Sequence, residues 1–259
     1  MSEQPQRHIR VTTGAMPRYC LIPGDPARAE RIAARMEGAR EVIRHREFLG
    51  FRGQISGVAV GVCSTGIGGP SASIAVEELA NIGVDTFIRV GSAGGRQPTV
   101  PVGSLVVVTA AHRGEGTSSA YLPPEFPAVA DLDVTAALME SARALGYPFT
   151  WGIVTTRDAF YRRDQRLAEL LSTVGGVVAA EQECAAVFIV ATVRRARAGA
   201  VLAIDSNILL PRLDPDEGER LFRQAEARAI EVALGAVVRL AARDGGTVDG
   251  PGEVAGCRR

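Results

Sequence analysis

The sequence predicts a single α/β domain in which a largely parallel sheet is covered on both faces by helices. The chain has 259 residues, an ordinary size for one domain. Short apolar runs bounded by Gly or Pro alternate with segments of helical periodicity. Several of these runs carry Val or Ile at consecutive positions, which is typical of strands buried on both faces.

The strands and helices follow from these patterns in chain order. Strands are expected near Tyr19–Ile22, Val58–Cys63, Thr86–Val90, Leu105–Ala110, Gly152–Thr155, Val177–Ala180 and Ala200–Ile204. Helices are expected at Pro26–Met36, Pro70–Ile82, Asp133–Leu145, Arg163–Leu171, Glu183–Arg195 and Asp214–Arg243. A long loop is expected at Gly114–Pro127. The domain is predicted to span residues 1–243, followed by a polar, Gly-rich tail at 244–259 that is expected to be disordered.

The composition excludes several kinds of partner. Lys+Arg and Asp+Glu each total 29, so the net charge is zero and binding to nucleic acid or an anionic membrane is not expected. The four cysteines lack CxxC spacing and paired histidines, and three lie in or beside apolar stretches, so free buried thiols and no metal site are expected. The N-terminal residues have no apolar core and no run approaches the roughly 20 apolar residues of a membrane span, so a cytoplasmic protein is expected.

The segment LIPGDPAR, residues 21–28, is predicted to run from a strand through a glycine turn into a helix. Pro26 suits the first helical turn, where its missing N–H is not needed. Backbone N–H groups at such a helix start form an anion site that Arg28, one turn further on, would also reach. The alternative is a plain strand-to-helix turn with a solvated arginine.

The segment FIRVGSAG, residues 87–94, places Arg89 in the middle of an otherwise apolar strand, where a charge is costly without a partner. The following glycines allow a ligand to approach the backbone at the C-terminal edge of the sheet. An inward arginine beside the Ser92 hydroxyl and a glycine turn indicates oxyanion binding. The alternative is a structural ion pair with a carboxylate.

Two further segments place carboxylates at strand ends. Glu181 and Glu183 follow an apolar run and precede an apolar helix, and they are positioned to accept hydrogen bonds from the vicinal hydroxyls of a sugar. The alternative for Glu183 is that it serves the helix N-terminus. Asp205 ends another apolar strand, where a carboxyl with a raised pKa can act as a general acid. Its alternative is an Asx turn or a cap.

In this order and at these separations, the four segments resemble the nucleoside phosphorylase family that includes uridine phosphorylase and hexameric bacterial purine nucleoside phosphorylase. The resemblance extends from His8 to Arg243 and is carried by the motifs PGDPARAERIA, HREFLGFRG, STGIGGPSASI, IRVGSAGG, EFPAVAD, DAFYRRDQR and AEQECAAVF. It implies a three-layer α/β/α fold with a mixed, mostly parallel sheet. It also implies a pentosyltransferase that cleaves a ribonucleoside with inorganic phosphate, yielding free base and ribose 1-phosphate without any cofactor.

The resemblance also implies roles for individual residues. The phosphate site would consist of Gly24, Arg28, Arg89 and Ser92. Arg46 would join that site from a neighbouring subunit, and His8 would reach the neighbour's ribose 5′-hydroxyl, which requires at least a dimer and points to a trimer of dimers. The ribose would contact Glu181, Gln182 and Glu183, with Gln182 replacing the usual Met. Phe160 would pack near the sugar and base.

The base pocket resembles two branches of the family. Arg166 matches an arginine that reads uracil in uridine phosphorylases, but Asp164 stands where a Gln is expected, and a carboxylate donates to a carbonyl oxygen only when it is protonated. Asp205 fits, within one residue, the acid with which purine members protonate N7. A purine or mixed base preference is therefore favoured over a strict uridine phosphorylase.

Two other functions remain open at this point. A nucleosidase of the same fold would use water and would be expected to lose the phosphate-site arginines, all three of which are present. A non-catalytic nucleoside-binding protein would need its catalytic positions to be broken.

Overall fold

The structure is a computed structural model that describes residues 4–161 and 166–245. Within these ranges, the strands are β1 (Tyr19–Leu21), β2 (Glu37–His45), β3 (Phe48–Ile55), β4 (Val58–Cys63), β5 (Thr86–Gly95), β6 (Leu105–Gly114), β7 (Ala128–Val129), β8 (Thr150–Arg157), β9 (Ala179–Glu181) and β10 (Arg197–Asn207). The helices are α1 (Pro26–Ala33), α2 (Gly69–Asn81), the short 3-10 helix η1 (Ser118–Ala120), α3 (Leu132–Ala144), α4 (Arg166–Thr173), α5 (Cys184–Val193) and α6 (Pro215–Arg243).

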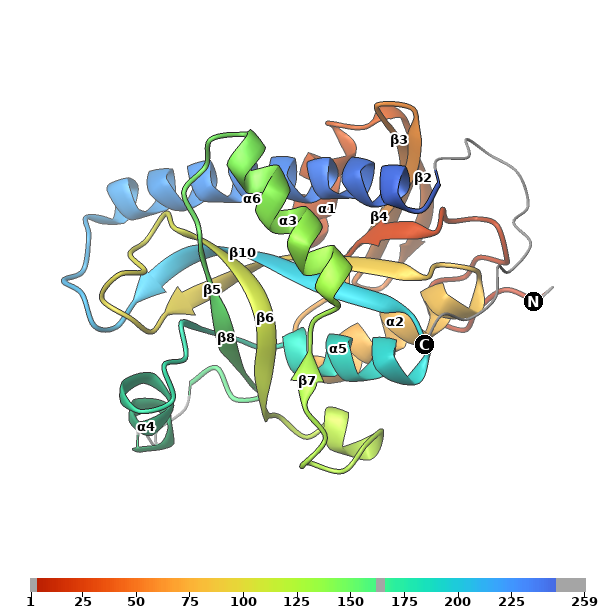
Figure 1. The fold of residues 1–259 in the computed structure, drawn as a ribbon. Helices are drawn as coiled ribbons and strands as arrows, with labels where there is room; N and C mark the ends of the chain where they lie inside the picture. Colours follow the sequence, from red (N-terminus) through yellow and green to blue (C-terminus); the bar gives the residue numbers. More distant parts are fainter. Residues whose placement is uncertain (1–3, 162–165, 246–259) are drawn as a thin grey trace.

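Two layers of helices enclose the sheet (Figure 1). Helices α1, α3 and α6 pack on one face, where Ile32, Val134 and Leu240 share a core. Helices α2 and α5 pack on the other face, where Val76 and Phe188 share a second core. The three-layer arrangement and the mixed sheet implied by the resemblance are confirmed. No helix in the described part of the chain is long and apolar enough to cross a membrane.

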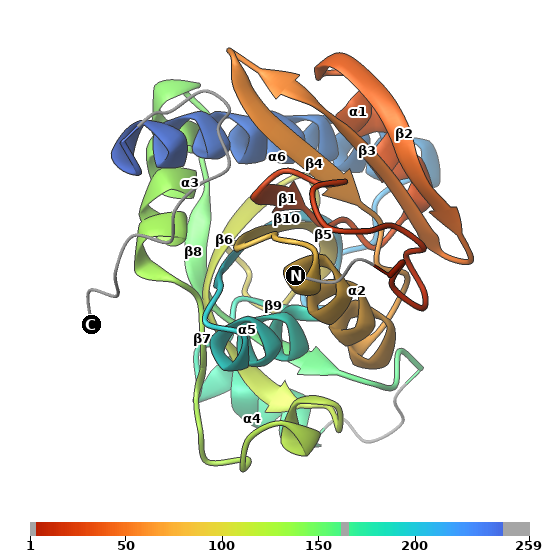
Figure 2. The same ribbon diagram turned by 90° about the vertical axis from the view of Figure 1, so that its right-hand side faces the viewer.

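Strand β5 is the centre of the sheet, because it pairs with β1, β9 and β10. The path β10–β6–β8–β9–β5 returns to β10, so this half of the sheet is strongly curved (Figure 2). Among the described strands, five pairings are parallel and five are antiparallel. Strands β1, β4, β5 and β10 run parallel to one another, so their C-terminal ends meet at one edge.

The hairpin of β2 and β3 and the two-residue strand β7 are absent from the sequence prediction. Most of β2 is exposed, and its charged residues leave no alternation of apolar and polar positions. Strand β3 begins with buried residues but contains two glycines, which weaken a strand pattern. The predicted helices are present, although α1 ends at Ala33 rather than Met36. The predicted start of α4 at Arg163 lies outside the described residues.

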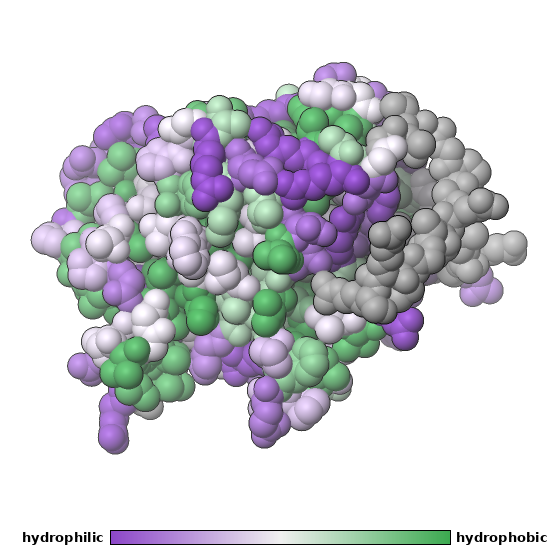
Figure 3. Space-filling model, viewed as in Figure 1, coloured by the Kyte–Doolittle hydropathy of each residue, from purple (hydrophilic) through white to green (hydrophobic). Residues whose placement is uncertain are grey.

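Exposed apolar side chains occur at several places on the surface. On the face seen in Figure 3, one group of them lies over α4, and hydrophilic residues cover part of α6. The exposed apolar residues of α4 are Leu167 and Leu170. Buried thiols are confirmed for Cys20, Cys63 and Cys184, whereas Cys257 lies outside the described residues. Burial raises the pKa of the Cys63 thiol to about 12, so this thiol is unreactive at neutral pH.

The folded domain extends past the predicted boundary at Arg243. The Tyr19 hydroxyl donates a hydrogen bond to the Asp244 carboxylate at 2.7 Å, and Arg197 forms an ion pair with it at 2.5 Å. These contacts join the end of α6 to β1 and β10. Asp244 therefore belongs to the domain, and the rest of the expected tail, residues 246–259, lies outside the described residues.

The substitution Asp244→Asn is expected to lower the free energy of unfolding by about 1–2 kcal/mol at pH 7, because it weakens hydrogen bonds to a charged group. Burial acts in the opposite direction, but the hydrogen bonds from Arg197 and Tyr19 lower the pKa of Asp244 below its ordinary value of 3.8. The stabilisation is therefore present above that value and is lost as pH falls through the lower pKa of the folded state. Urea unfolding at pH 7 and near pH 3 measures both effects.

The matched control is Glu125→Gln in an exposed loop, which should change stability little at either pH. A difference between Asp244→Asn and the parent that is the same at both pH values would contradict the assigned role of the carboxylate.

Candidate active site

The predicted site residues of three parallel strands meet at the C-terminal edge of the sheet. Gly24 follows β1, Ser92 lies in the second half of β5, and Asp205 lies near the end of β10. The loop after β4 joins them, because the N–H groups of Thr65 and Gly66 donate to the carbonyls of Pro23 and Gly24 at 2.8 and 3.0 Å. The chain thus brings backbone turns and polar side chains together at the edge where α/β proteins bind ligands.

Arg89 is the buried cation of this edge, with 4% of its surface exposed. Its Nε donates to Glu181 at 3.2 Å and its Nη2 donates to Glu183. Burial disfavours the charged form, but the two carboxylates raise the pKa of Arg89 above its ordinary value. A Cβ on Gly24 would lie 4.0 Å from Nη1 of Arg89. The ion-pair alternative for Arg89 is therefore correct, and the same guanidinium borders the turn predicted to hold phosphate.

Both carboxylate oxygens of Glu181 accept hydrogen bonds from groups of the protein itself. Its Oε2 accepts from the first N–H groups of α5, at Glu183 and Cys184, at 2.8 and 2.9 Å, as well as from Arg89. Its Oε1 accepts from the Thr156 hydroxyl at 2.5 Å. Glu181 therefore caps α5 and positions Arg89.

Glu183 is the second carboxylate partner of Arg89. It lies at the N-cap of α5, but its side chain makes no cap hydrogen bond there. Its Oε1 accepts from the Gly68 N–H at 2.6 Å, at the start of α2, and its Oε2 accepts from Arg89. Burial raises the pKa of the Glu183 carboxyl, and the charge of Arg89 opposes this. Each oxygen retains a lone pair that a sugar hydroxyl can use.

Arg28 is turned into the protein rather than toward solvent. It is 5% exposed, its Nε donates to Glu226 of α6 at 2.6 Å, and its Nη1 donates to the Val90 carbonyl at 3.2 Å. The alternative of a solvated arginine is therefore wrong. The Asp25 side chain accepts from the Ala27 N–H at 2.9 Å and so caps the start of α1. Arg28 thus contributes to this edge as the cation of a buried ion pair.

His8 and Arg46, the two residues predicted to act on a neighbouring subunit, lie near each other. His8 is fixed by Glu78 of α2, which accepts from its ring Nδ1 at 2.7 Å and from its backbone N–H. Arg46 is exposed at the turn between β2 and β3, with a φ of 55°. The pKa of Glu47 is lowered by the hydrogen bond from Ser71 and by the charges of both Arg46 and His8. The two residues therefore share one surface region.

Asp205 lies in a β-bulge. The register of β10 against β5 shifts between Ile204 and Ser206, and a bulge of this kind re-aims a side chain. The Ser206 hydroxyl donates to the Asp205 carboxylate at 2.7 Å. Protein atoms displace part of the water around the carboxyl and raise its pKa, although its side chain is exposed at the surface. A raised pKa of Asp205 agrees with its expected role as a general acid.

The other residues predicted near the base lie on one loop and its neighbours. Phe160 is 63% exposed and packs edge to face on Tyr161. Gln182 donates to the Asp158 carbonyl at 2.9 Å, which ties β9 to the same loop. Arg166 begins α4 and is exposed. Asp164 lies outside the described residues.

Three charged residues of this region are missing from the sequence prediction, namely Glu78, Arg96 and Glu226. All three are at most 8% exposed. Glu78 and Glu226 lie on the buried sides of α2 and α6, and a charged residue beside an apolar helical stripe is the signal that reveals such positions. Arg96 follows directly on the glycines that end β5, and this position is its only signal in the sequence.

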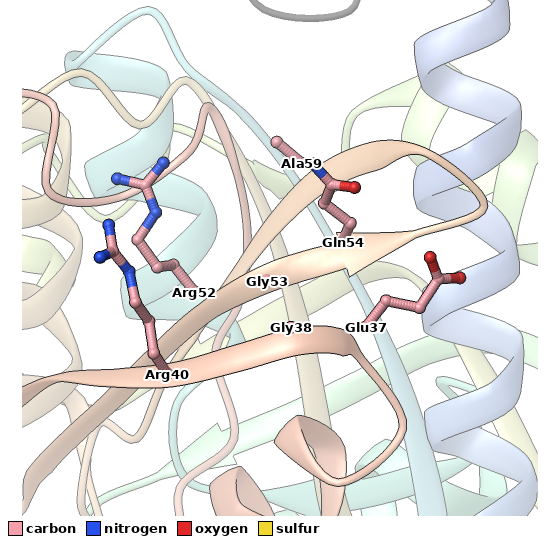
Figure 4. Close-up of a pocket in the computed structure, with 7 residues that line it drawn as sticks. All are labelled: Glu37, Gly38, Arg40, Arg52, Gly53, Gln54 and Ala59. Carbon is pink, nitrogen blue, oxygen red and sulfur yellow. The ribbon is translucent and has the colours of Figure 1, made fainter.

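A surface hollow of about 330 Å³ lies away from these residues (Figure 4). It lies at the opposite ends of β3 and β4 from Gly66, and Arg40 and Arg52 lie side by side in it. Its lining residues are Glu37, Gly38, Arg40, Arg52, Gly53, Gln54 and Ala59, none of which belongs to the predicted site.

Residues 18–242 match the family model described as the phosphorylase superfamily. The chain belongs to the phosphorylase superfamily. It is 43% identical over 217 residues to a uridine phosphorylase of Thermococcus kodakarensis, covering 79% of this chain and 78% of that relative. It is 36% identical over 244 residues to a guanosine phosphorylase of Halorubrum lacusprofundi, covering 93% and 100%.

A solved structure of a phosphorylase superfamily member has the same fold. The crystal structure of uridine phosphorylase from Vibrio fischeri matches with a TM-score of 0.86 and 29% sequence identity, covering 91% of this chain and 97% of that one. The family predicted from the sequence motifs is confirmed, and so is the enzyme class, a pentosyltransferase.

The substitution Glu226→Gln is expected to lower the free energy of unfolding by about 3 kcal/mol at neutral pH, because it leaves the buried Arg28 guanidinium without its counter-ion. Burial opposes the shift, but hydrogen bonds and charges of Arg28 and Arg31 lower the pKa of Glu226 below its ordinary value of 4.5. The stabilisation therefore persists above that value and is lost as pH falls through the folded-state pKa. Denaturant unfolding at several pH values is the measurement.

Glu219→Gln is the matched control on the same helix, since Glu219 forms an exposed pair with Arg223 that should contribute less than about 1 kcal/mol. If both variants lose the same small amount, the Arg28–Glu226 pair does not hold α1 to α6 as assigned.

Proposed function

We propose that this chain is a nucleoside phosphorylase that cleaves the N-glycosidic bond of ribonucleosides with inorganic phosphate, with a purine or mixed base preference. The position of Arg89 is the observation that carries this proposal. One side of its guanidinium borders the Gly24 turn, and the other holds Glu183. An anion binder and an acceptor for sugar hydroxyls are therefore adjacent, as phosphorolysis requires.

In the proposed reaction, phosphate attacks the anomeric carbon of the ribose. Gly24, Arg28, Arg89 and Ser92 form the proposed phosphate site, in which both arginines are already paired with carboxylates. Glu183 positions the ribose through its hydroxyls. A phosphate oxygen forms the new bond to the anomeric carbon while the bond to the base nitrogen breaks and its electron pair leaves with the base. The phosphate dianion stabilises the positive charge that develops on the sugar.

Charge balance supports a site shared between two subunits. Arg89 faces the two carboxylates Glu181 and Glu183, and Arg28 is paired with Glu226, so these cations are already compensated within one protomer. A bound phosphate dianion adds negative charge that needs another cation nearby. Arg46, exposed on the surface that also carries His8, is the proposed source, acting on the neighbour in a dimer that assembles further into a trimer of dimers.

Asp205 and Arg166 are proposed to assist the leaving base, with Phe160 packing against the sugar and base and Gln182 beside the ribose. Relatives named uridine phosphorylase and guanosine phosphorylase support a mixed preference. Phosphate is a co-substrate, and no further cofactor is proposed. The three buried free thiols support the proposed cytoplasmic location, where thiols remain reduced.

The first test is release of base from inosine, adenosine, guanosine, uridine and thymidine, each with and without phosphate. Phosphate-dependent cleavage of a purine nucleoside is expected, and Asp205→Asn should reduce it about 100-fold because an amide cannot transfer a proton to the base. Since the pKa of Asp205 is raised, the protonated form persists to higher pH than in an ordinary carboxyl. Purine cleavage should therefore decline as pH rises through that raised pKa.

The other outcomes of this test are equally informative. Cleavage of uridine alone, indifferent to Asp205→Asn, would transfer the base chemistry to Arg166 and indicate a strict uridine phosphorylase. Cleavage without phosphate would make water the nucleophile and contradict the proposal.

A shared site predicts complementation between subunits. Arg46→Ala and Arg89→Ala should each abolish most activity, because each removes a cation from every phosphate site. In a mixed dimer, one site combines an intact Arg89 with an intact Arg46 from the neighbour, so co-expressed variants should recover about a quarter of the parent activity. Mixed oligomers, verified by differently tagged subunits, that show no recovery would rule out a contribution of Arg46 to a neighbouring site.

A further inference from the structure

Arg96, directly after β5, is a buried cation that the proposed phosphate and ribose contacts do not use. It is 6% exposed, and its Nη1 donates to the Gly95 carbonyl at 3.1 Å. Within the described ranges Arg96 forms no ion pair, and the carboxylate whose charge reaches it is that of Asp205. Burial, together with the charge of Arg157, lowers the pKa of Arg96. The position is thus costly for a cation unless a ligand supplies an acceptor.

Arg96 and the bulge of β10, with Asp205 and Ser206, lie next to Gly94. Together they form what is called here one wall of the site. A Cβ on Gly94 would lie 3.3 Å from Nη1 of Arg96 and 3.1 Å from the hydroxyl of Ser206, which itself donates to Asp205. The lack of a side chain at Gly94 allows these groups of adjoining segments to approach one another. The wall therefore presents an arginine, a hydroxyl and a carboxyl together.

The same glycine connects this wall to the proposed ribose subsite. Gly94 pairs with Ser206 across β5 and β10, and with Ala180 across β5 and β9. Ala180 directly precedes Glu181, which positions Arg89 beside Glu183. A base attached to a ribose at Glu183 would therefore have Arg96 and Asp205 within the adjoining part of the site.

We propose that Arg96 donates a hydrogen bond to the exocyclic carbonyl oxygen of the leaving base, O6 of a 6-oxopurine or O4 of uracil, and thereby selects keto bases over amino bases. This inference rests on the proposed function. Arginine only donates, so it matches a carbonyl oxygen and opposes the amino group that adenine or cytosine carries at the same place. Asp205, on the same wall, remains the partner of the adjacent ring nitrogen.

The selection acts mainly in the transition state. As the glycosidic bond breaks, its electron pair passes into the base and part of the negative charge reaches the carbonyl oxygen. A guanidinium fixed at that oxygen binds the departing keto base more strongly than the intact nucleoside. Uracil and 6-oxopurines share this carbonyl, so a single arginine can serve both classes of substrate.

The test compares Arg96→Met with the parent on pairs of substrates of which one carries the carbonyl and the other lacks it. Inosine is paired with purine riboside, which lacks O6, and uridine with pyrimidin-2-one riboside, which lacks O4. The variant should lower kcat/KM for the keto nucleoside about 100-fold, largely in kcat, because a hydrogen bond from a charged group is lost. For the analogue without the carbonyl, the same substitution should change kcat/KM by no more than roughly threefold.

Two further variants guard against an effect of misfolding. Arg143→Met, on the exposed side of α3, is the matched control and should leave both substrates unchanged. Arg96→Lys keeps a cationic donor and should lose less activity on the keto nucleoside than Arg96→Met. Losses of equal size on the keto nucleoside and its analogue, or no loss on either, would overturn the assignment of Arg96.

Calorimetric binding of free hypoxanthine and uracil in the presence of phosphate separates this inference from the proposed function. If the parent binds these bases without turning over any nucleoside, and Arg96→Met weakens their binding, Arg96 reads the carbonyl and the proposed function is wrong. If nucleosides are cleaved but Arg96→Met alters neither binding nor the ratio of keto substrate to analogue, the proposed function stands and the role of Arg96 is wrong.

Discussion

The buried charge of Arg89 is the constraint on which the rest of the site depends. A guanidinium inside a sheet needs anionic partners, and Arg89 obtains them from Glu181 and Glu183, which flank the start of α5. Glu181 also holds the Thr156 hydroxyl of β8, and Glu183 also holds the start of α2. A single charge thereby fixes the relative positions of two strands and two helices. The geometry that compensates Arg89 is the same geometry that presents Glu183 beside the Gly24 turn.

The chain direction of the strands explains why these groups meet. Strands β1, β4, β5 and β10 are parallel, so the loops that follow them share one edge. Glycines let the loops approach closely: a Cβ on Gly24 would lie 3.1 Å from the carbonyl oxygen of Gly66. Side chains at this edge are therefore set by rigid backbone rather than by long flexible loops, which favours precise placement of a small anion.

The sequence predicts the strands and helices of the core because their periodicity reflects burial. It does not predict the β2–β3 hairpin, since an exposed strand rich in charged residues lacks that periodicity. It identifies Arg28 and Arg89 as unusual but not their partners. Arg28 and Glu226 are 198 residues apart, and their contact depends on how α6 crosses α1. Whether Glu181 or Glu183 caps α5 likewise depends on side-chain direction, which a spacing of two residues leaves open.

The two ends of the site differ in how the charges of their buried arginines are compensated. At the proposed phosphate end, Arg28 and Arg89 are each paired with carboxylates, so their charges are compensated within one protomer. At the other end, Arg96 is buried with a backbone carbonyl as its hydrogen-bond partner and Asp205 nearby. In the proposed dimer, the phosphate dianion would bind where a cation of the neighbouring subunit completes the charge, so binding would be coupled to assembly. The base is neutral and gains negative charge only as its glycosidic bond breaks. A buried cation of the same protomer, the proposed role of Arg96, would therefore stabilise it mainly in the transition state.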